Sequence, residues 1–140
     1  MEWFSETLTY STNGKGMTMI TEDILRIILR LKINTGMCYL FLPHTSASLT
    51  ICENYDPESR EDVESFFERV VPENQPWYKH TLEGPDDSPS HIRSILTQPS
   101  ITIPIDKRKL SLGTWQGLFL FEHRAVPHNR NLLVRFLKVK

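Results

Sequence analysis

Apolar residues recur along this chain with two different periods, and each period predicts a different kind of element. From Trp3 to Tyr10 apolar and polar residues alternate, as in a half-buried strand, and turn residues follow at positions 13–16. Thr21 is suited to cap a helix, because two acids follow it and apolar residues then recur three and four positions apart. These core-facing residues are Ile24, Ile27, Ile28 and Leu31. Residues 34–36, Asn-Thr-Gly, are expected to end this helix.

The middle of the chain predicts two more strands, two more helices and a long loop. Residues 37–42 are consecutively apolar between a glycine and a proline, which favours a strand buried on both faces, and another strand is expected over 46–54. Asp56 is expected to cap a second helix, whose buried stripe would be Val63, Phe66, Phe67 and Val70. Residues 73–87 form a proline-rich loop, long enough to indicate a function. Ser88 is expected to cap a short third helix that ends at Leu96.

Three further strands are predicted in the last third of the chain, over residues 101–105, 117–123 and 132–139. The order of elements shows no alternation of strand and helix, so a doubly wound nucleotide fold is not expected. A single core can serve a chain of 140 residues. We therefore expect one α+β domain over residues 1–140, with a largely antiparallel sheet or sandwich, two main helices and one short helix.

The composition fits a globular protein and excludes several classes. Hydrophobic residues make up 39% of the chain and charged residues 24%, so the chain as a whole is not disordered. No apolar run approaches the roughly 18 to 20 residues of a membrane helix, and the N-terminus lacks a signal-peptide pattern. A cytoplasmic protein without a membrane partner is expected. Cys38 and Cys52 lie in apolar stretches, where cysteine is commonly free and buried.

The net charge of −1 conceals two regions of opposite sign. Residues 53–87 hold eleven acids and three bases, a net charge of −8, and residues 106–140 hold eight bases and two acids, a net of +6. Much of the acidic excess falls on the expected solvent face of the second helix. The basic tail is suited to bind phosphate, to pair with the acidic helix or to protect an edge strand. Because its bases are scattered, no nucleic-acid partner is expected.

Four of the five histidines fall where predicted elements begin or end. His44 follows a buried strand, His80 lies in the long loop, His91 falls in the first turn of the third helix and His123 ends a strand. Neutral imidazole is a common metal ligand, and three ligands with one open position make a catalytic zinc site. The spacing matches no compact zinc motif, so a hydrogen-bonded structural role stays open for each. His128, in a polar turn, is expected to be exposed.

Three short blocks add further polar groups. HTSAS places hydroxyls, among them Ser46, after a histidine, and Glu53 and Asn54 follow within ten residues. Since no GxSxG elbow is present, these groups suit oxyanion binding or the orientation of an imidazole better than serine catalysis. Glu53 is either a general base or an exposed acid. EGPDDSPSH joins two carboxylates to a helix start, as in a metal-bridged phosphate site or a simple cap. Trp115, in GTWQG, suits a pocket wall or the core.

The blocks HTSASLTICENYDPESREDVE, EGPDDSPSHIRSIL and LGTWQGLFLFEHR occur in the order typical of the YjbQ family. The chain resembles this family over almost its whole length, with GKGMTMITEDI similar to the family's N-terminal turn and helix. GTWQG is the most specific of these signatures. The resemblance implies a compact α+β domain that assembles as a homotrimer, a metal-associated pocket, and a weak thiamine phosphate synthase activity. Met19, Cys52 and Tyr55 depart from the family pattern, which affects the expected substrate more than the fold.

The resemblance and the side-chain chemistry together predict three groups of site residues. The expected catalytic residues are His44, Glu53 and Arg124. A divalent ion, Zn²⁺ or Mg²⁺, would be held by His44, His80, His91 and His123. The expected substrate-binding residues are Ser46, Asn54, Trp115 and Gln116.

The implied reaction joins a pyrimidine diphosphate to a thiazole phosphate and releases pyrophosphate. Such a reaction needs a divalent cation at the leaving group, a cationic side chain such as Arg124 and an aromatic shelf such as Trp115. Two alternatives stay open: a metal-dependent hydrolase of a small phosphorylated compound, and a noncatalytic trimeric module that binds a small ligand. Both hypotheses of a metal-dependent enzyme require that the histidine side chains lie close together in the folded protein.

Overall fold

The computed structural model describes residues 1–140 and confirms the α+β class, with three helices and two antiparallel sheets. In chain order the elements are β1 (Glu2–Thr12), β2 (Gly16–Met19), α1 (Thr21–Arg30), β3 (Gly36–Phe41), β4 (Ala47–Glu53), α2 (Pro57–Val70), α3 (Asp87–Leu96), β5 (Ser100–Asp106), β6 (Lys109–Leu110), β7 (Gln116–Glu122) and β8 (His128–Lys138).

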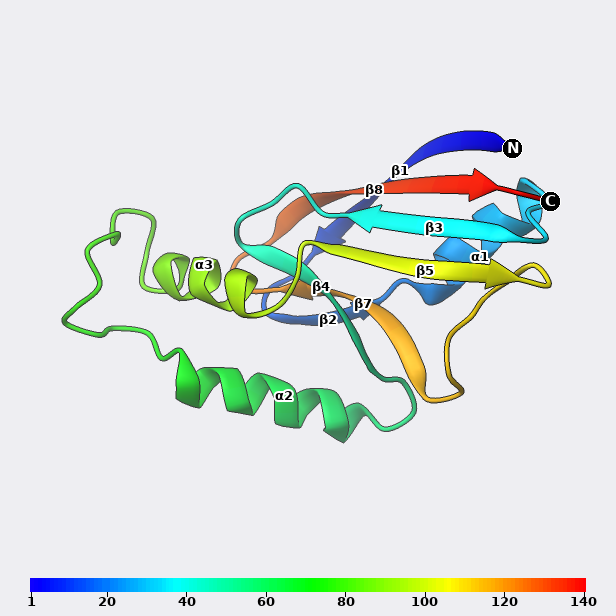
Figure 1. Ribbon diagram of the computed structural model, residues 1–140. Helices are drawn as coiled ribbons and strands as arrows, with labels where there is room; N and C mark the ends of the chain where they lie inside the picture. Colours follow the sequence, from blue (N-terminus) through cyan, green and yellow to red (C-terminus); the bar gives the residue numbers. More distant parts are fainter.

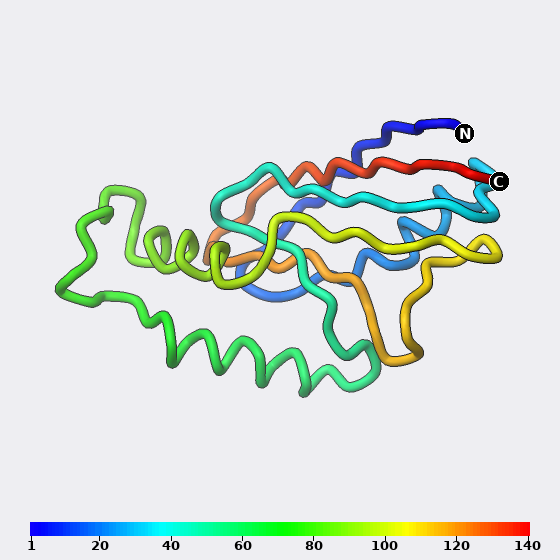
Figure 2. Tube along the Cα trace, viewed as in Figure 1, coloured from blue at the N-terminus to red at the C-terminus, as the bar shows by residue number.

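The larger sheet has the strand order β1-β8-β3-β5-β6, and the smaller sheet has the order β2-β7-β4. β8 lies between β1 and β3, and it pairs with β1 over the full length of both strands. The main core joins apolar residues of both sheets to one face of α1. Figures 1 and 2 show that the loop between α2 and α3 lies at one end of the molecule and the chain termini at the other.

Helix α1 buries the predicted residues Ile24, Ile27 and Ile28, but its ends differ from the prediction. The cap position is Ile20, because the Thr21 hydroxyl accepts a hydrogen bond from the Leu118 amide of β7 instead of capping the helix. The helix ends at Arg30, before the predicted Asn-Thr-Gly stop. Tertiary contacts with β7 therefore replace the local cap that the sequence indicated.

Helix α2 begins as predicted, with the Asp56 side chain accepting a hydrogen bond from the Glu58 amide. Its predicted stripe is partly wrong. Phe67 is buried against Phe121 of β7, whereas Phe66 and Val70 are 57% and 52% exposed. Of the predicted stripe, Phe67 and the partly buried Val63 belong to the small apolar cluster between α2 and β7.

Short elements account for the other differences. β2 and β6 were not predicted, since each is only a few residues long and is defined by its partner strand. Helix α3 begins at Asp87, one residue before the predicted cap.

His128 is half-buried because it begins β8 opposite Thr12, so the prediction of an exposed side chain was wrong. Both cysteines are free. No helix has the length and the apolar character needed to cross a membrane.

Candidate metal centre and pocket

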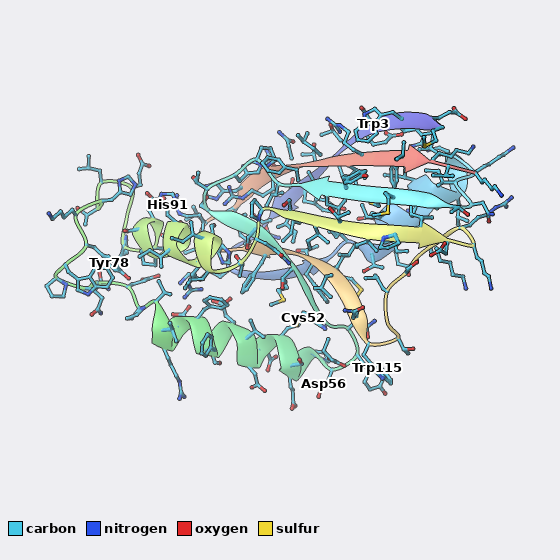
Figure 3. All side chains as sticks on the ribbon, in the orientation of Figure 1. Trp3, Cys52, Asp56, Tyr78, His91 and Trp115 are labelled. Atoms are coloured by element: carbon cyan, nitrogen blue, oxygen red, sulfur yellow. The ribbon has the colours of Figure 1, made fainter.

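The β4–β7 strand pair has two ends that carry most of the predicted site residues. At one end Ala47 pairs with Glu122, and the turn before β4 and helix α3 lie beside it; we call this the histidine end. At the other end Glu53 pairs with Gln116, near Trp115; we call this the tryptophan end. Figure 3 shows the labelled His91 and Trp115 at opposite ends of the small sheet.

Three side chains converge at the histidine end. One ligand atom from each of His80, Asp87 and His91 lies within 4.8 Å of the other two. Asp87 and His91 are four residues apart on α3 and so share one face of the helix, while His80 comes from the long loop. The Asp87 Oδ2 atom lies 2.7 Å from His80 Nε2 and 3.3 Å from His91 Nε2. Two imidazoles and one carboxylate are a suitable ligand set for a divalent transition metal.

The second oxygen of Asp87 is held by Arg124. Arg124 Nη1 donates to Asp87 Oδ1 at 2.9 Å, Nε donates to Asp86 at 2.9 Å, and Nη2 donates to the Glu83 carbonyl. Burial acts to raise the pKa of Asp86, but hydrogen bonds from the Ala125 amide and from Arg124 outweigh it and the pKa is lowered. The acidic middle and the basic tail of the chain therefore meet here. Arg124 orients Asp87 so that Oδ2 faces the two histidines.

The orientation of His91 is also fixed from outside the cluster. Its Nδ1 atom lies 2.8 Å from the carbonyl oxygen of Thr45. Because a carbonyl only accepts hydrogen bonds, Nδ1 carries the proton and donates it. The lone pair of Nε2 is then available on the side of Asp87. This is the usual arrangement of a metal-binding histidine, whose other nitrogen donates to a backbone carbonyl.

A cavity of about 790 Å³ opens beside the cluster, within the size range of small-molecule sites. His44, His80 and His91 lie on its wall, and no lysine, arginine or carboxylate does. Its hydroxyl-bearing lining residues are Thr45, Ser48, Ser88, Ser94 and Thr97. A second cavity of about 220 Å³ shares His80 and Ser88 with the first. The pocket therefore offers hydroxyl groups and imidazoles, and the carboxylate of the cluster lies just behind its wall.

His44 and His123 lie outside the three-residue cluster. His44 is on the pocket wall, where its Nε2 accepts a hydrogen bond from the Asn131 amide. His123 is fully buried, with Nε2 2.9 Å from the Ser48 hydroxyl and no hydrogen-bond partner for Nδ1. Burial, assisted by the nearby positive charge of Arg93, lowers the pKa of His123 to about 3. A neutral His123 thus supports the wall of the pocket from behind through Ser48.

Ser46 is buried at the histidine end, and its hydroxyl accepts a hydrogen bond from Arg130 Nη2 at 2.9 Å. Arg130 is in turn paired with the buried carboxylate of Glu122. Hydrogen bonds from Arg130 and Thr12 outweigh the effect of burial and lower the pKa of Glu122, so this pair is ionised. Ser46 therefore takes part in a buried network beside the pocket.

The remaining predicted residues lie together at the tryptophan end. The Glu53 carboxylate accepts hydrogen bonds from the Tyr55 and Asp56 amides, and the Asn54 side chain donates to the carbonyls of Thr114 and Gln116. The Gln116 side chain accepts from the Gly113 amide. Trp115 is 60% exposed and lies edge-to-face with Tyr55. Within one chain, these groups are separated from the cluster of His80, Asp87 and His91 by the length of the strand pair.

Several residues of this site were absent from the predicted set. Asp87 was considered only within EGPDDSPSH, as a carboxylate of a metal-bridged phosphate site or as a helix cap, and was not combined with His80 and His91, although its spacing of four residues from His91 was the available signal. Ser48 and Thr97 line the pocket and share a hydrogen bond of 2.6 Å across β4 and the end of α3. Nothing in the local sequence indicated this second pair, since the two residues meet only in the fold.

Comparison with known proteins identifies the relatives of this chain. The sequence model of the UPF0047 protein YjbQ-like family matches residues 6–139. A UPF0047 protein of Synechocystis is 46% identical over 92% of this chain and 88% of its own length. The UPF0047 protein YjbQ of Escherichia coli O157:H7 is 43% identical over 94% of this chain and 95% of its own.

Solved structures show the same relationship. The crystal structure of a conserved hypothetical protein from Thermus thermophilus superposes with a TM-score of 0.83 at 34% identity, over 94% of this chain and 99% of that one. A YjbQ/UPF0047 family protein from Clostridium acetobutylicum gives a TM-score of 0.83 at 33% identity, over 96% of this chain and 99% of that one. This chain therefore belongs to the YjbQ-like UPF0047 family.

Proposed function

We propose that this protein is a metal-dependent enzyme that acts on a small phosphorylated compound, with a divalent ion held by His80, Asp87 and His91. One observation carries the proposal: three ligand atoms from the loop and from α3 converge beside a pocket of small-molecule size. Arg124 and the Thr45 carbonyl orient two of these ligands from outside. Such outer support is a common feature of metal centres.

The ligand types favour one group of metals. Imidazole ligands suit Zn²⁺, Fe²⁺ and related ions, whereas Mg²⁺ prefers oxygen ligands alone. Of the two ions expected from the sequence, Zn²⁺ fits this ligand set better. Three protein ligands leave a coordination position open, which is typical of catalytic zinc sites. An ion at this place would supply positive charge to phosphoryl oxygens and to a leaving group.

A phosphorylated ligand in this pocket would depend on such an ion for neutralisation of its charge. No cationic side chain lines the wall, so the hydroxyl groups and imidazoles are the available hydrogen-bonding groups. Arg124 donates to Asp86, Asp87 and the Glu83 carbonyl. We therefore propose that Arg124 orients Asp87 and does not bind phosphate directly. The joining of a pyrimidine diphosphate to a thiazole phosphate, with release of pyrophosphate, is the specific reaction we propose.

The metal site is tested by elemental analysis and by titration of the metal-free full chain with ZnCl₂. We expect one ion per chain in the wild type and loss of that ion in His80→Ala, whose side chain is largely exposed and so is replaceable without unfolding. His128→Ala is the matched control, because His128 belongs to no ligand cluster. Equal zinc content in the wild type and His80→Ala contradicts the site.

The reaction is tested by mass spectrometry of the metal-loaded protein with both thiamine precursors. Formation of thiamine phosphate and pyrophosphate supports the proposed transfer. Turnover of a generic phosphate ester without that product supports the alternative hydrolase. Saturable binding without any product supports the noncatalytic module. Light scattering in the same buffer tests the proposed homotrimer, and fractionation of cells tests the proposed cytoplasmic location.

A further inference from the structure

His44 is held by a backbone hydrogen bond that determines which of its nitrogens carries a proton. The Asn131 amide donates to His44 Nε2 at 2.9 Å. A backbone N–H only donates, so Nε2 must present its lone pair to Asn131. The neutral ring therefore carries its proton on Nδ1.

The fold imposes this arrangement at the end of a strand. β3 ends at Phe41, which pairs with Leu133 of β8. Asn131 precedes Leu133 by two residues in β8 and so lies beyond the end of β3, and the ring of His44 accepts a hydrogen bond from its amide. The backbone amide of His44 donates to the Leu42 carbonyl, so the chain turns sharply here and brings the ring back toward β8. The ring thus accepts a hydrogen bond from a β8 amide at a position that β3 does not reach.

The surroundings favour the neutral form of this ring. Burial lowers the pKa of His44, and the positive charge of Arg130 lowers it further, against smaller opposing contributions that include Glu122. If the proton moved from Nδ1 to Nε2, the Nε2–H group and the Asn131 N–H group would face each other and the hydrogen bond would be lost. Ligation of a metal through Nε2 would break the bond to Asn131, and ligation through Nδ1 would require that same unfavourable proton exchange.

The other nitrogen of the ring is free. Nδ1 makes no hydrogen bond within the chain and is not among the buried atoms that lack a partner, so it is open to solvent. The ring lies on the wall of the large pocket, and the adjacent residue Thr45 accepts the hydrogen bond from His91. We propose that His44 directs its Nδ1–H into this pocket as a donor to an oxyanion of the ligand, a phosphoryl or carboxylate oxygen, and does not bind the metal. This inference rests on the proposed function of the pocket.

The tautomer is tested by nitrogen-15 NMR of the full chain before and after addition of ZnCl₂, with the His44 signals assigned from the His44→Asn spectrum. We expect a protonated Nδ1 and an unprotonated Nε2 in His44 under both conditions, while His80 and His91 change on addition of zinc. A protonated Nε2 in His44, or a ring nitrogen of His44 that shifts as a zinc ligand does, overturns the proposal.

The donor role is tested by titration with inorganic phosphate in the presence of zinc. In His44→Leu the affinity for phosphate is expected to fall about tenfold or more, the effect of losing a hydrogen bond to a charged group. In His44→Asn, whose amide nitrogen lies near the position of Nδ1, most of the affinity is expected to remain. Equal phosphate affinity in the wild type and a folded His44→Leu overturns the donor role.

The failure of the metal site and the failure of this inference are distinguishable. Both His44 variants are expected to bind zinc as the wild type does, and loss of zinc from a folded His44→Leu contradicts the inference. If the wild type binds no zinc, the proposed metal site fails. The tautomer of His44 and the phosphate titration without zinc then still decide whether His44 is a donor.

Discussion

The two ends of the β4–β7 strand pair carry similar sets of polar residues but use them differently. The six residue steps from Ala47 to Glu53 cover about 20 Å along an antiparallel strand. At the histidine end, His80, Asp87 and His91 direct ligand atoms toward one another. At the tryptophan end, Glu53 and Asn54 direct their polar atoms to backbone groups.

This difference distinguishes two kinds of polar residue in the family signature: those that stabilise the backbone and those that are available to bind a ligand. The Glu53 carboxylate and the Asn54 amide satisfy backbone groups where β4 leaves the sheet, a local structural need. The cluster at the histidine end differs, because one ligand atom from each of its three side chains lies near the other two, beside a pocket. The proposed reaction therefore belongs to the histidine end, and we propose that the tryptophan end serves stability. Substitutions at both ends test this division.

The largest effect is expected from Asp87→Asn. The substitution removes the negative charge between the two imidazoles and keeps the size of the side chain. Loss of an outer-shell partner costs roughly 10- to 100-fold in metal affinity, so loss of a ligand charge should cost roughly 100-fold or more. Titration with zinc against a chelator measures it. Glu53→Gln, at the tryptophan end, is the control and should leave zinc affinity unchanged; equal affinities in both variants contradict the assignment.

The second effect concerns pH and the buried His123. Its pKa is lowered to about 3 in the folded protein, below the ordinary value of a histidine in the unfolded chain. Between pH 6.5 and about 3 the unfolded chain therefore binds a proton that the native state excludes. The free energy of unfolding should fall as pH decreases, by up to about 1.4 kcal/mol per pH unit from this group.

Urea denaturation at several pH values checks this contribution in the wild type and in His123→Gln. The glutamine side chain does not titrate and keeps a polar partner for Ser48, so the pH dependence should become shallower. Parallel pH profiles for the two proteins would show that His123 does not resist protonation.

A smaller effect is expected from Glu53→Ala at the tryptophan end. The carboxylate accepts hydrogen bonds from the Tyr55 and Asp56 amides just before α2, much as a helix cap does. Its removal should lower the free energy of unfolding by about 1–2 kcal/mol, as loss of a capping side chain does, with unchanged catalysis. Chemical denaturation and an activity assay on the same samples separate the two roles. Lost activity in a stable, folded variant would return Glu53 to the catalytic residues.

The smallest effect is expected from Trp115→Ala. The ring is 60% exposed and contacts Tyr55 edge-to-face, so its loss should cost about 0.5–1 kcal/mol. Zinc and phosphate affinities should remain at wild-type values, because the ring does not line the pocket. Calorimetric titration measures both affinities. A weakened ligand affinity would make the tryptophan end part of a binding site, as the sequence signature predicted.

The main elements of the fold were predictable because their patterns are local. The helical spacing of Ile24, Ile27 and Ile28 and the apolar run of residues 37–42 correspond to α1 and β3. Elements that depend on a distant partner were not predictable. β2 exists because it pairs with β7, and Phe66 is exposed because nothing packs against that side of α2.

The candidate site was predictable only in part, for the same reason. The sequence indicated His80 and His91 as metal ligands, but four histidines at element ends looked alike. The Asn131 amide distinguishes His44, and complete burial beside Ser48 distinguishes His123. Both partners are remote in the chain, so no local spacing reveals them.

The sequence by itself determined the residue types, the periodic elements and the family signature, because each depends on neighbouring positions. Only the tertiary structure decided which polar side chains are free to act. A carboxylate such as Glu53 and a carboxylate such as Asp87 have the same intrinsic chemistry, and the difference lies in what the fold places beside each. Glu53 meets backbone amides, and Asp87 meets two imidazoles at the edge of a pocket.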